Sequence, residues 1–215
     1  GGDAVMVHPD IKKLSDIKGK RVSIVNIPLG LYMLNRVLDK ANLSRQDVEV
    51  FPMADTHQEG FYRQGKADVV ITYEPTKTRL ANQGMNVIFD SSDIPNEIFD
   101  LLVVHEDTYM QRKAEICSIT QQWFKTLNYM QQHPQDAANH ISNRLGVEPA
   151  EFTAMLDGIV FPTRKINTQM LGGNIPGILE PAGRLNQIML LEGQLSRDIN
   201  LAHALDPDFV NCFTQ

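Results

Sequence analysis

The side chains that could build a catalytic or metal site are spaced in ways that fit neither kind of site. Six histidines occur in 215 residues, but none forms an HExxH or HxH pattern, and none pairs with a cysteine. No GxSxG nucleophile turn is present, and no GxGxxG follows a predicted strand. We therefore expect no catalytic residue, no metal ion and no cofactor, and we assign the chain no enzymatic activity.

The two cysteines, Cys117 and Cys212, are far apart in the sequence and lack metal-type spacing. A disulfide between them is one alternative. Two buried free thiols are the interpretation that the sequence favours, because unpaired cysteine is among the residue types most often buried.

Residues suited to holding a small molecule lie where the predicted strands end. In an open α/β sheet, ligands bind beyond the carboxyl ends of the strands. The first turn of the following helix adds backbone N–H donors there, and a glycine allows close backbone approach. The candidate ligand-binding residues are Asn26, Leu29, Gly30, Asp55, Thr56, Tyr73, Glu74 and Asp100.

Several of these positions also have a structural interpretation. Gly30 fits a plain strand-to-helix turn, Glu74 a solvent-exposed carboxylate, and Asp100 a turn residue on the hinge side. We interpret Asp68 as a residue that caps or turns the start of a strand. Gly65 is interpreted as the residue that ends a helix in the left-handed conformation.

Hydrophobic periodicity predicts the elements that position these residues. Strands are predicted at 1–7, 21–26, 48–51, 67–72 and 85–89. Helices are predicted between them at 31–43, 56–66 and 76–83, with Thr56 capping the second. Alternation of strands and helices with short connections indicates a parallel, doubly wound sheet.

The pattern changes after residue 90. One more strand is predicted at Phe99–His105, and the chain beyond it is predicted to be helical. Residues 158–176 have a looser pattern. The predicted helices are 109–132, a helix from Pro134 to about Leu145, 149–157 and 179–192.

Composition restricts the partners. With 42% hydrophobic residues the chain can bury a substantial core, as one large domain or two small lobes. Its net charge of -6 argues against nucleic acid, which would select a basic face. No apolar run approaches the roughly 20 residues that a membrane span requires.

Six short segments together carry a resemblance that none carries alone. In this order they resemble the ABC-importer solute-binding proteins of the nitrate/sulfonate/taurine and thiamine-precursor (NMT1/THI5-like) branch. The resemblance covers essentially all 215 residues. The segments are Ile11–Val22 (IKKLSDIKGKRV), Asn42–Val48 (NLSRQDV), Gly65–Val69 (GKADV), Tyr73–Pro75 (YEP), Phe99–Val104 (FDLLVV) and Leu205–Phe209 (LDPDF).

This resemblance implies an α/β fold of the type II periplasmic-binding-protein kind. It implies one doubly wound lobe and a helical C-terminal portion that belongs to an incomplete first lobe. The expected ranges are 1–11 for a crossing strand from lobe one, 12–95 for lobe two, 96–106 for a return crossing strand and 107–215 for the helical part of lobe one.

The same resemblance implies a function and a cellular location. We expect a small solute to bind in an interlobe cleft and to be delivered to the permease of an ABC importer. The location would be periplasmic or extracytoplasmic, with lipid anchoring of the parent protein left open. The alternative is a ligand-sensing input domain of a membrane signalling protein.

One relative of this family is a pyrimidine-forming enzyme that uses a cysteine-rich segment and a histidine. Cys117 and Cys212 are the only cysteines here, so we do not expect that activity. Because the first residues read as a strand already under way, we expect a larger parent. A dimer or a domain-swapped assembly would then cover apolar surface left exposed.

The expected solute follows from the charges near the candidate site. The turn Ile27–Leu31 supplies apolar surface and backbone N–H groups but no hydroxyl. Glu74, Asp100 and Asp3 place carboxylates nearby, and a carboxylate desolvated beside an anion is costly. The sequence therefore favours an amine-bearing, zwitterionic or heterocyclic solute over an inorganic anion.

Overall fold

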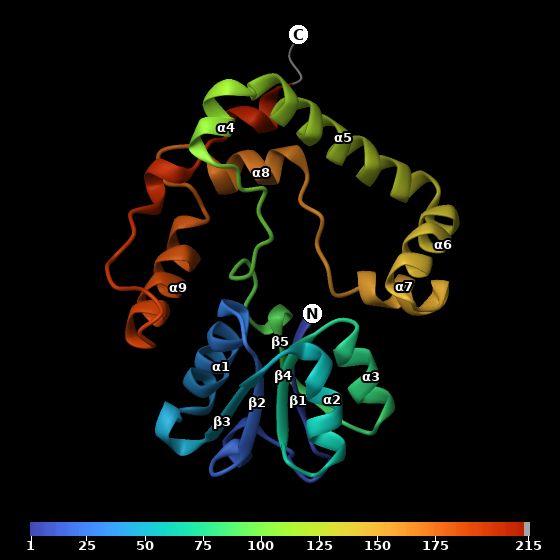
Figure 1. Cartoon of the computed structure of the whole chain (residues 1–215), viewed down its shortest axis with the longest axis vertical. Helices are drawn as coiled ribbons and strands as arrows, with labels where there is room; N and C mark the ends of the chain where they lie inside the picture. Colours follow the sequence, from blue (N-terminus) through green and yellow to red (C-terminus); the bar gives the residue numbers. More distant parts are fainter. Residues whose placement is uncertain (213–215) are drawn as a thin grey trace. The chain divides into compact units, whose positions relative to one another are not determined.

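The computed structural model describes residues 1–212, except for the side chains of residues 209 and 211. The chain divides into two compact units, drawn in Figure 1. No helix among the described residues is long and apolar enough to cross a membrane. Unit 1 contains Gly1–Pro95, Asp157–Ile159 and Arg184–Asp198, and unit 2 contains Asn96–Leu156, Val160–Gly183 and the residues from Ile199 onward.

Unit 1 is built on a five-stranded sheet with the strand order β3-β2-β4-β1-β5. Strand β2 runs parallel to β3 and β4, whereas β1 runs antiparallel to both of its neighbours, β4 and β5. Residues 1–11, expected as a crossing strand, thus supply an inner strand of this sheet. The strands are β1 (Asp3–Val7), β2 (Arg21–Val25), β3 (Glu49–Met53), β4 (Val69–Tyr73) and β5 (Asn86–Asp90).

The antiparallel β1 corrects the expectation of an all-parallel sheet. Residues 8–20, which follow β1, contain a single 3-10 turn at Leu14–Ile17 and no crossover helix. A chain needs a crossover to return to the end of the sheet where it started and add a parallel strand. Strand β1 therefore ends where β2 begins, and the two run in opposite directions. The strands that follow one another through helices are parallel, as predicted.

Three helices join the strands of unit 1, namely α1 (Pro28–Ala41), α2 (Asp55–Arg63) and α3 (Thr76–Asn82). The steps from β2 to β3 and from β3 to β4 run in opposite directions along the sheet. Because such crossovers are right-handed, α1 and α2 lie on opposite faces. Residues of α2 and α3 pack with Ala4, Met6 and Val70 of the sheet. The doubly wound arrangement predicted from the sequence is confirmed.

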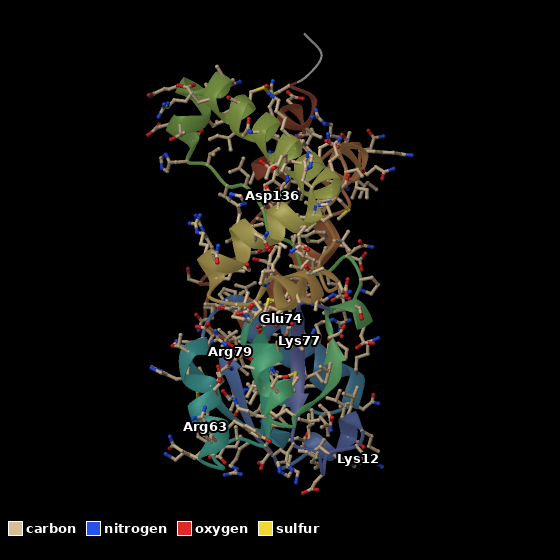
Figure 2. The ribbon with its side chains drawn as sticks, turned by 90° about the vertical axis from the view of Figure 1, so that its right-hand side faces the viewer. Lys12, Arg63, Glu74, Lys77, Arg79 and Asp136 are labelled. Atoms are coloured by element: carbon tan, nitrogen blue, oxygen red, sulfur yellow. A yellow bond between two sulfur atoms is a disulfide. The ribbon has the colours of Figure 1, made fainter. Side chains whose placement is uncertain are left out.

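The strand ends of unit 1 define two regions that Figure 2 separates. At the carboxyl end of the sheet, β2, β3 and β4 end and β1 begins; Glu74 and Lys77 lie there. At the amino end, those three strands begin and β1 ends. Lys12 and Arg63 lie at this opposite end.

Of the two residues predicted to end and to cap α2, Gly65 is confirmed and Thr56 is wrong. Gly65 has a φ of +67° and donates its N–H to the Tyr62 carbonyl at 2.8 Å, so it ends the helix as predicted. Thr56 does not cap the start, because α2 already begins at Asp55 and Ala54 is its N-cap. An acidic residue in the first turn is favourable there, since it faces the positive end of the helix dipole.

The starts of β2 and β4 are held together by Arg21 and Asp68. The guanidinium Nε and one terminal nitrogen donate to the two carboxylate oxygens at 3.0 and 2.8 Å, and the Arg21 backbone N–H donates to Asp68 at 3.0 Å. The side-chain hydrogen bond from Arg21 lowers the pKa of Asp68, against the opposing effect of partial burial. Asp68 thus fixes the start of a strand, as the sequence analysis expected.

We expect Asp68→Asn to weaken the response of stability to acid. A carboxylate whose folded pKa lies below its usual value of about 3.9 contributes stability above that value and loses it as pH falls through the folded pKa. Urea unfolding measured at pH values between about 5 and 2 should therefore show a shallower loss of stability in the variant than in the parent chain. Parallel curves would contradict a structural role for this pair. Asp10→Asn, which changes an exposed carboxylate, is the control.

Unit 2 is helical in its described part. The predicted helix at 109–132 is divided at Arg112, whose backbone is not helical, and the looser segment 158–176 contains a helix that was not predicted. The helices are α4 (Glu106–Gln111), α5 (Lys113–Gln132), α6 (Pro134–Leu145), α7 (Pro149–Leu156) and α8 (Arg164–Leu171). Helix α9 (Leu179–Leu191) begins in unit 2 and continues into unit 1 at Arg184.

The predicted return strand at Phe99–His105 does not form. In the described part of the chain the five strands of unit 1 make the one sheet, so this segment has no strand to pair with. Leu101, Leu102 and Val103 are exposed. A dimer or swapped assembly that would cover such residues stays a prediction, as does the assignment of the ranges to lobes.

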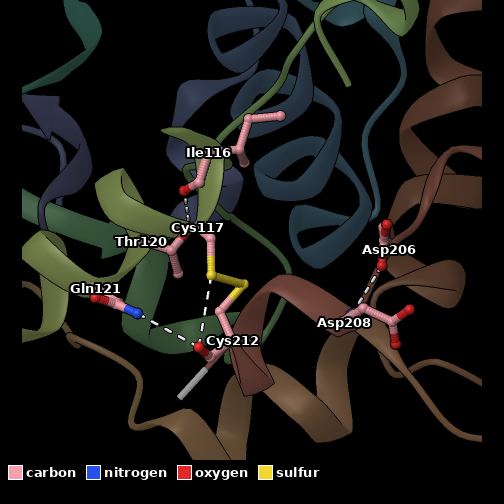
Figure 3. Close-up of a disulfide and its surroundings, with 7 residues drawn as sticks. All are labelled: Ile116, Cys117, Thr120, Gln121, Asp206, Asp208 and Cys212. Carbon is pink, nitrogen blue, oxygen red and sulfur yellow. Dashed lines mark hydrogen bonds between the residues drawn. A yellow bond between two sulfur atoms is a disulfide. The ribbon is translucent and has the colours of Figure 1, made fainter. Parts of the chain in front are cut away.

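The two cysteines form a disulfide, which corrects the expectation of free thiols. Cys117 of α5 and Cys212 are joined with their Cα atoms 5.7 Å apart, and Gln121 Nε2 donates to the Cys212 carbonyl at 3.4 Å (Figure 3). The two residues are separated by 95 positions, so only the fold brings them together.

Candidate functional site

The fold gathers seven of the eight candidate residues at the carboxyl end of the unit 1 sheet. Asn26 follows β2, Asp55 follows β3, and Tyr73 is the last residue of β4. Asp100 is the exception, because it belongs to unit 2, where it is exposed in a segment without regular structure. The other four residues at the carboxyl end are Leu29, Gly30, Thr56 and Glu74.

The turn after β2 is the first part of this site. The Asn26 backbone N–H donates to the Met53 carbonyl at 2.8 Å, which joins the ends of β2 and β3 and leaves the Asn26 side chain exposed. Helix α1 begins at Pro28, three residues earlier than predicted. Pro28 has no N–H, and the Gly30 N–H donates to the Ile27 carbonyl at 3.0 Å. The helix therefore offers fewer N–H donors than the sequence suggested.

Gly30 is buried against the end of β2. A Cβ atom at this position would lie 2.1 Å from the Val25 carbonyl oxygen. The close approach of the helix to the strand is therefore sufficient to explain the glycine. A direct contact between Gly30 and a ligand stays a prediction.

Tyr73 lies between strand ends that carry carboxylates. Asp3 is its register partner across β1 and β4, and Asp55 begins α2. Burial raises the pKa of the Tyr73 hydroxyl, and the negative charges of Asp55 and Asp3 raise it further. The hydroxyl is accordingly neutral near pH 7 and can donate a hydrogen bond as well as accept one.

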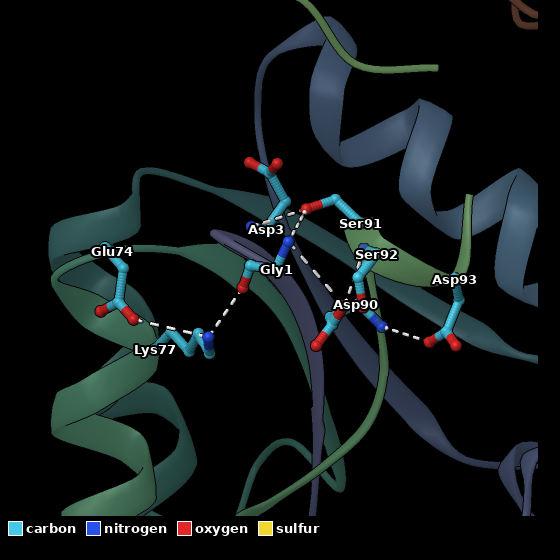
Figure 4. A network of polar contacts seen from close by, with 8 residues as sticks. All are labelled: Gly1, Asp3, Glu74, Lys77, Asp90, Ser91, Ser92 and Asp93. Carbon is cyan, nitrogen blue, oxygen red and sulfur yellow. Dashed lines mark hydrogen bonds and ion pairs between the residues drawn. The ribbon is translucent and has the colours of Figure 1, made fainter. Parts of the chain in front are cut away.

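Glu74 has local partners that the sequence analysis missed. Its carboxylate accepts the Thr78 backbone N–H at 3.1 Å. It also lies 3.6 Å from the Lys77 ammonium, as Figure 4 shows. Lys77 also donates to the Gly1 carbonyl at 2.7 Å. The side chain of Glu74 is only 14% exposed. Glu74 therefore holds the first turn of α3, and a cation offsets its charge. The spacing of Glu74 and Lys77, three residues apart, was the signal available in the sequence.

Ser91, which follows β5, is a second residue that the sequence analysis missed. Its hydroxyl accepts the Asp3 backbone N–H at 3.4 Å (Figure 4). This contact joins the end of β5 to the start of β1, beside Tyr73 of β4. No sequence motif marks Ser91, because its position depends on the antiparallel placement of β1.

A surface hollow of about 440 Å³ lies along one face of α2, from Thr56 near its start to Gln64 just after its end. Thr56 is the one candidate residue that lines it. Among the described residues, no group of three or more His, Cys, Asp or Glu side chains is arranged to hold a metal ion. The other lining residues are Met53, His57, Gly60, Phe61 and Gln64.

Comparison with known families supports the resemblance drawn from the short segments. The family described as NMT1/THI5 like matches residues 3–137. This chain belongs to the NMT1/THI5-like family. The match includes all of β1 to β5, and its range also contains all eight candidate residues, Asp100 among them. No curated protein sequence matches this NMT1/THI5-like chain at a significant level.

Solved structures show the fold of this NMT1/THI5-like chain. It is similar to the periplasmic aliphatic sulphonate binding protein SsuA from Escherichia coli, with a TM-score of 0.72 at 15% identity. The match covers 95% of this chain and 65% of that one, so the chain spans slightly less than two thirds of that protein. The fold is that of the type II periplasmic binding proteins, as expected.

Two further structures have the same fold. The ligand-binding component of an ABC-type import system from Staphylococcus aureus, solved with zinc bound, has a TM-score of 0.74 at 10% identity. That match covers 98% of this NMT1/THI5-like chain and 70% of the other. A desulfurization enzyme, DSZB, has a TM-score of 0.65 at 14% identity and covers 98% and 75%. Proteins of this fold thus include both solute-binding proteins and an enzyme.

Proposed function

We propose that the chain is part of an extracytoplasmic solute-binding protein that delivers a small molecule to the permease of an ABC importer. The observation that carries the proposal is the gathering of Asn26, Asp55 and Tyr73 at the carboxyl end of an open α/β sheet, where such folds bind ligands. Family membership supports it, as do similar structures described as a sulphonate-binding protein and an import-system component.

The chain is proposed to bind its solute without converting it. Tyr73, Asp3 and Asp55 can form hydrogen bonds to a solute, and the sequence has no HExxH, HxH or GxSxG pattern that would mark a nucleophile and its base. Both cysteines are joined in the disulfide of unit 2, so neither is available as a thiolate. These features favour the solute-binding proteins over the desulfurization enzyme as a guide to function.

The disulfide supports the proposed location. Disulfides persist in oxidising compartments such as the bacterial periplasm and are rare in the cytosol. The Cys117–Cys212 bond is consistent with a periplasmic or extracytoplasmic chain. It supports that location independently of the similarity to periplasmic proteins.

The charges at the carboxyl end favour a solute with an amine or a nitrogen heterocycle. The negative charges of Asp55 and Asp3 both act on the Tyr73 hydroxyl and raise its pKa further, beyond the effect of burial. An ammonium group would find carboxylate and hydroxyl acceptors there, while Lys77 lies nearby for the acidic group of a zwitterion. A bare oxyanion would instead lie beside carboxylates that lose water on binding, which is costly.

The experiment is a thermal-shift screen with two sets of solutes. One set holds amines, zwitterions and nitrogen heterocycles, and the other holds nitrate, sulfate and aliphatic sulfonates. We expect a member of the first set to raise Tm, because a ligand present at 100 times its Kd adds about 2.7 kcal/mol to stability. Asp55→Asn should weaken binding of that solute about tenfold or more, since a hydrogen bond to a charged group is lost.

Asp10→Asn is the matched control, because it removes the same charge from an exposed residue at the amino end of the sheet. A sulfonate or nitrate shift that Asp55→Asn leaves unchanged would contradict the solute class. Mass spectrometry of the bound solute after incubation tests the absence of turnover, and formation of a product would contradict the binding role.

A further inference from the structure

The amino end of the unit 1 sheet, opposite the candidate site, gathers basic side chains from four separate segments. They come from the connection after β1, the start of β2, the end of α2 and the start of β4. The chain as a whole carries a net charge of -6, so basic residues gather here in a chain that is acidic overall. The residues are Lys12, Lys13, Lys18, Lys20, Arg21, Arg63 and Lys66.

Acidic neighbours offset only some of these charges. Arg21 is bound by Asp68, Lys18 lies 3.1 Å from Asp47, and Lys13 lies 3.9 Å from Asp16. The remaining four have no acidic partner within ion-pair distance in the part of the chain that the structure describes. These four, Lys12, Lys20, Arg63 and Lys66, are called the basic end below.

Part of the basic end borders a hollow of about 450 Å³, which Asp10 also lines. Lys20 and Arg63 line it, and the Arg21–Asp68 pair forms part of its wall. Ile11 and Tyr62 add apolar surface. The hollow can therefore take the aliphatic part of a side chain together with a terminal carboxylate, which Lys20 and Arg63 would receive.

We propose that the basic end is a docking surface for an acidic segment of a partner protein. Charge complementarity decides between a polypeptide and an anionic membrane. Asp10 and Asp16 lie among the lysines, and the side chain of Asp10 is 90% exposed. A uniformly negative lipid surface would repel these carboxylates as it attracts the lysines. A polypeptide can place single carboxylates beside Lys20 and Arg63 and turn polar or basic groups toward Asp10, which lines the same hollow beside His8.

Docking here leaves the solute site accessible. Each strand of the sheet has five residues, for example β4, so the two ends are separated by roughly 16 Å at about 3.3 Å per residue. The proposal goes beyond the proposed function and does not depend on the identity of the solute.

The test uses the full chain and a fluorescently labelled peptide of alternating glutamate and serine, followed by fluorescence anisotropy. We expect binding at low salt that weakens as salt is added, because exposed charges are screened. Lys20→Gln/Arg63→Gln should weaken binding roughly five- to tenfold, the loss of two exposed ion pairs. The control Lys125→Gln/Lys165→Gln removes the same charge from exposed residues of unit 2 and should change binding less than about twofold.

Three outcomes would overturn the proposal. The first is that the peptide does not bind at low salt. The second is that peptide binding weakens equally in the two double variants. The third is that the chain binds phosphatidylglycerol vesicles through Lys20 and Arg63 but does not bind the peptide. Thermal melting of each variant shows whether it is folded. If Lys20→Gln/Arg63→Gln is not folded, Lys12→Gln/Lys66→Gln takes its place in the peptide-binding measurement. Solute binding should be unchanged in every variant, which separates this result from the test of the proposed function.

Discussion

Cys117→Ser is expected to lower the free energy of unfolding by about 4–5 kcal/mol, because a cross-link that closes a loop of roughly 100 residues removes that much conformational freedom from the unfolded chain. The bond joins positions separated by 95 residues, and both belong to unit 2. A loss of this size is a large part of the stability of an ordinary domain. We expect the helical signal of unit 2 to melt at a much lower temperature in the variant.

Urea unfolding of the oxidised parent, the reduced parent and Cys117→Ser measures this effect. Reduction should destabilise the parent by nearly as much as the substitution does, and the variant should not respond to reductant. Thr126→Ser, an exposed change on the same helix, is the control. Two thiols that react with a thiol reagent in the denatured, unreduced parent would show that the bond is absent.

The fold of unit 1 could be predicted from local patterns wherever a helix separates two strands. Alternating apolar residues, as in Val22 and Ile24 of β2, placed the strands, and the faces of α1 to α3 placed the helices. The direction of β1 could not be predicted in this way. Its sequence is the same kind of apolar run in either direction, and its orientation depends on the connection at residues 8–20, which contains no crossover helix.

The segment Phe99–His105 shows a second limit of local patterns. Leu101 to Val104 has the composition of a buried strand, but a strand is stable only when its backbone groups pair with a neighbour. The opposite error occurred at α8, which was missed although Thr163 caps it by accepting the Ile166 N–H at 3.3 Å. A threonine is a weak sign of a helix start when the residues after it are mostly polar and the apolar face of the helix is short.

The candidate site could be located from topology but not described in detail. The rule that ligands bind beyond strand ends brought Asn26, Asp55 and Tyr73 together. It could not show that Lys77 offsets Glu74, or that Asp3 lies opposite Tyr73, because the second depends on the antiparallel β1. The disulfide was one alternative from the sequence but not the favoured one, since no spacing rule relates residues 95 positions apart.

Gly30 distinguishes a structural glycine from a ligand contact. Alanine is normally the better residue inside a helix, by about 1 kcal/mol over glycine. In α1 the added Cβ would lie 2.1 Å from the Val25 carbonyl oxygen, and a backbone atom at the end of a strand cannot rotate away. The helix would have to move off the sheet, so the steric cost exceeds the gain in helix propensity.

We therefore expect Gly30→Ala to lower the free energy of unfolding by about 3 kcal/mol or more, at the upper end of the cost of overpacking. Gly60→Ala in α2 is the matched control, because a Cβ there would have no neighbour within 4 Å. It should stabilise the chain by up to about 1 kcal/mol. Urea unfolding followed by circular dichroism measures both variants. If Gly30→Ala were as stable as the parent and yet failed to bind the solute found in the thermal screen, Gly30 would be a ligand contact and the close packing of α1 on β2 would not be the reason for the glycine.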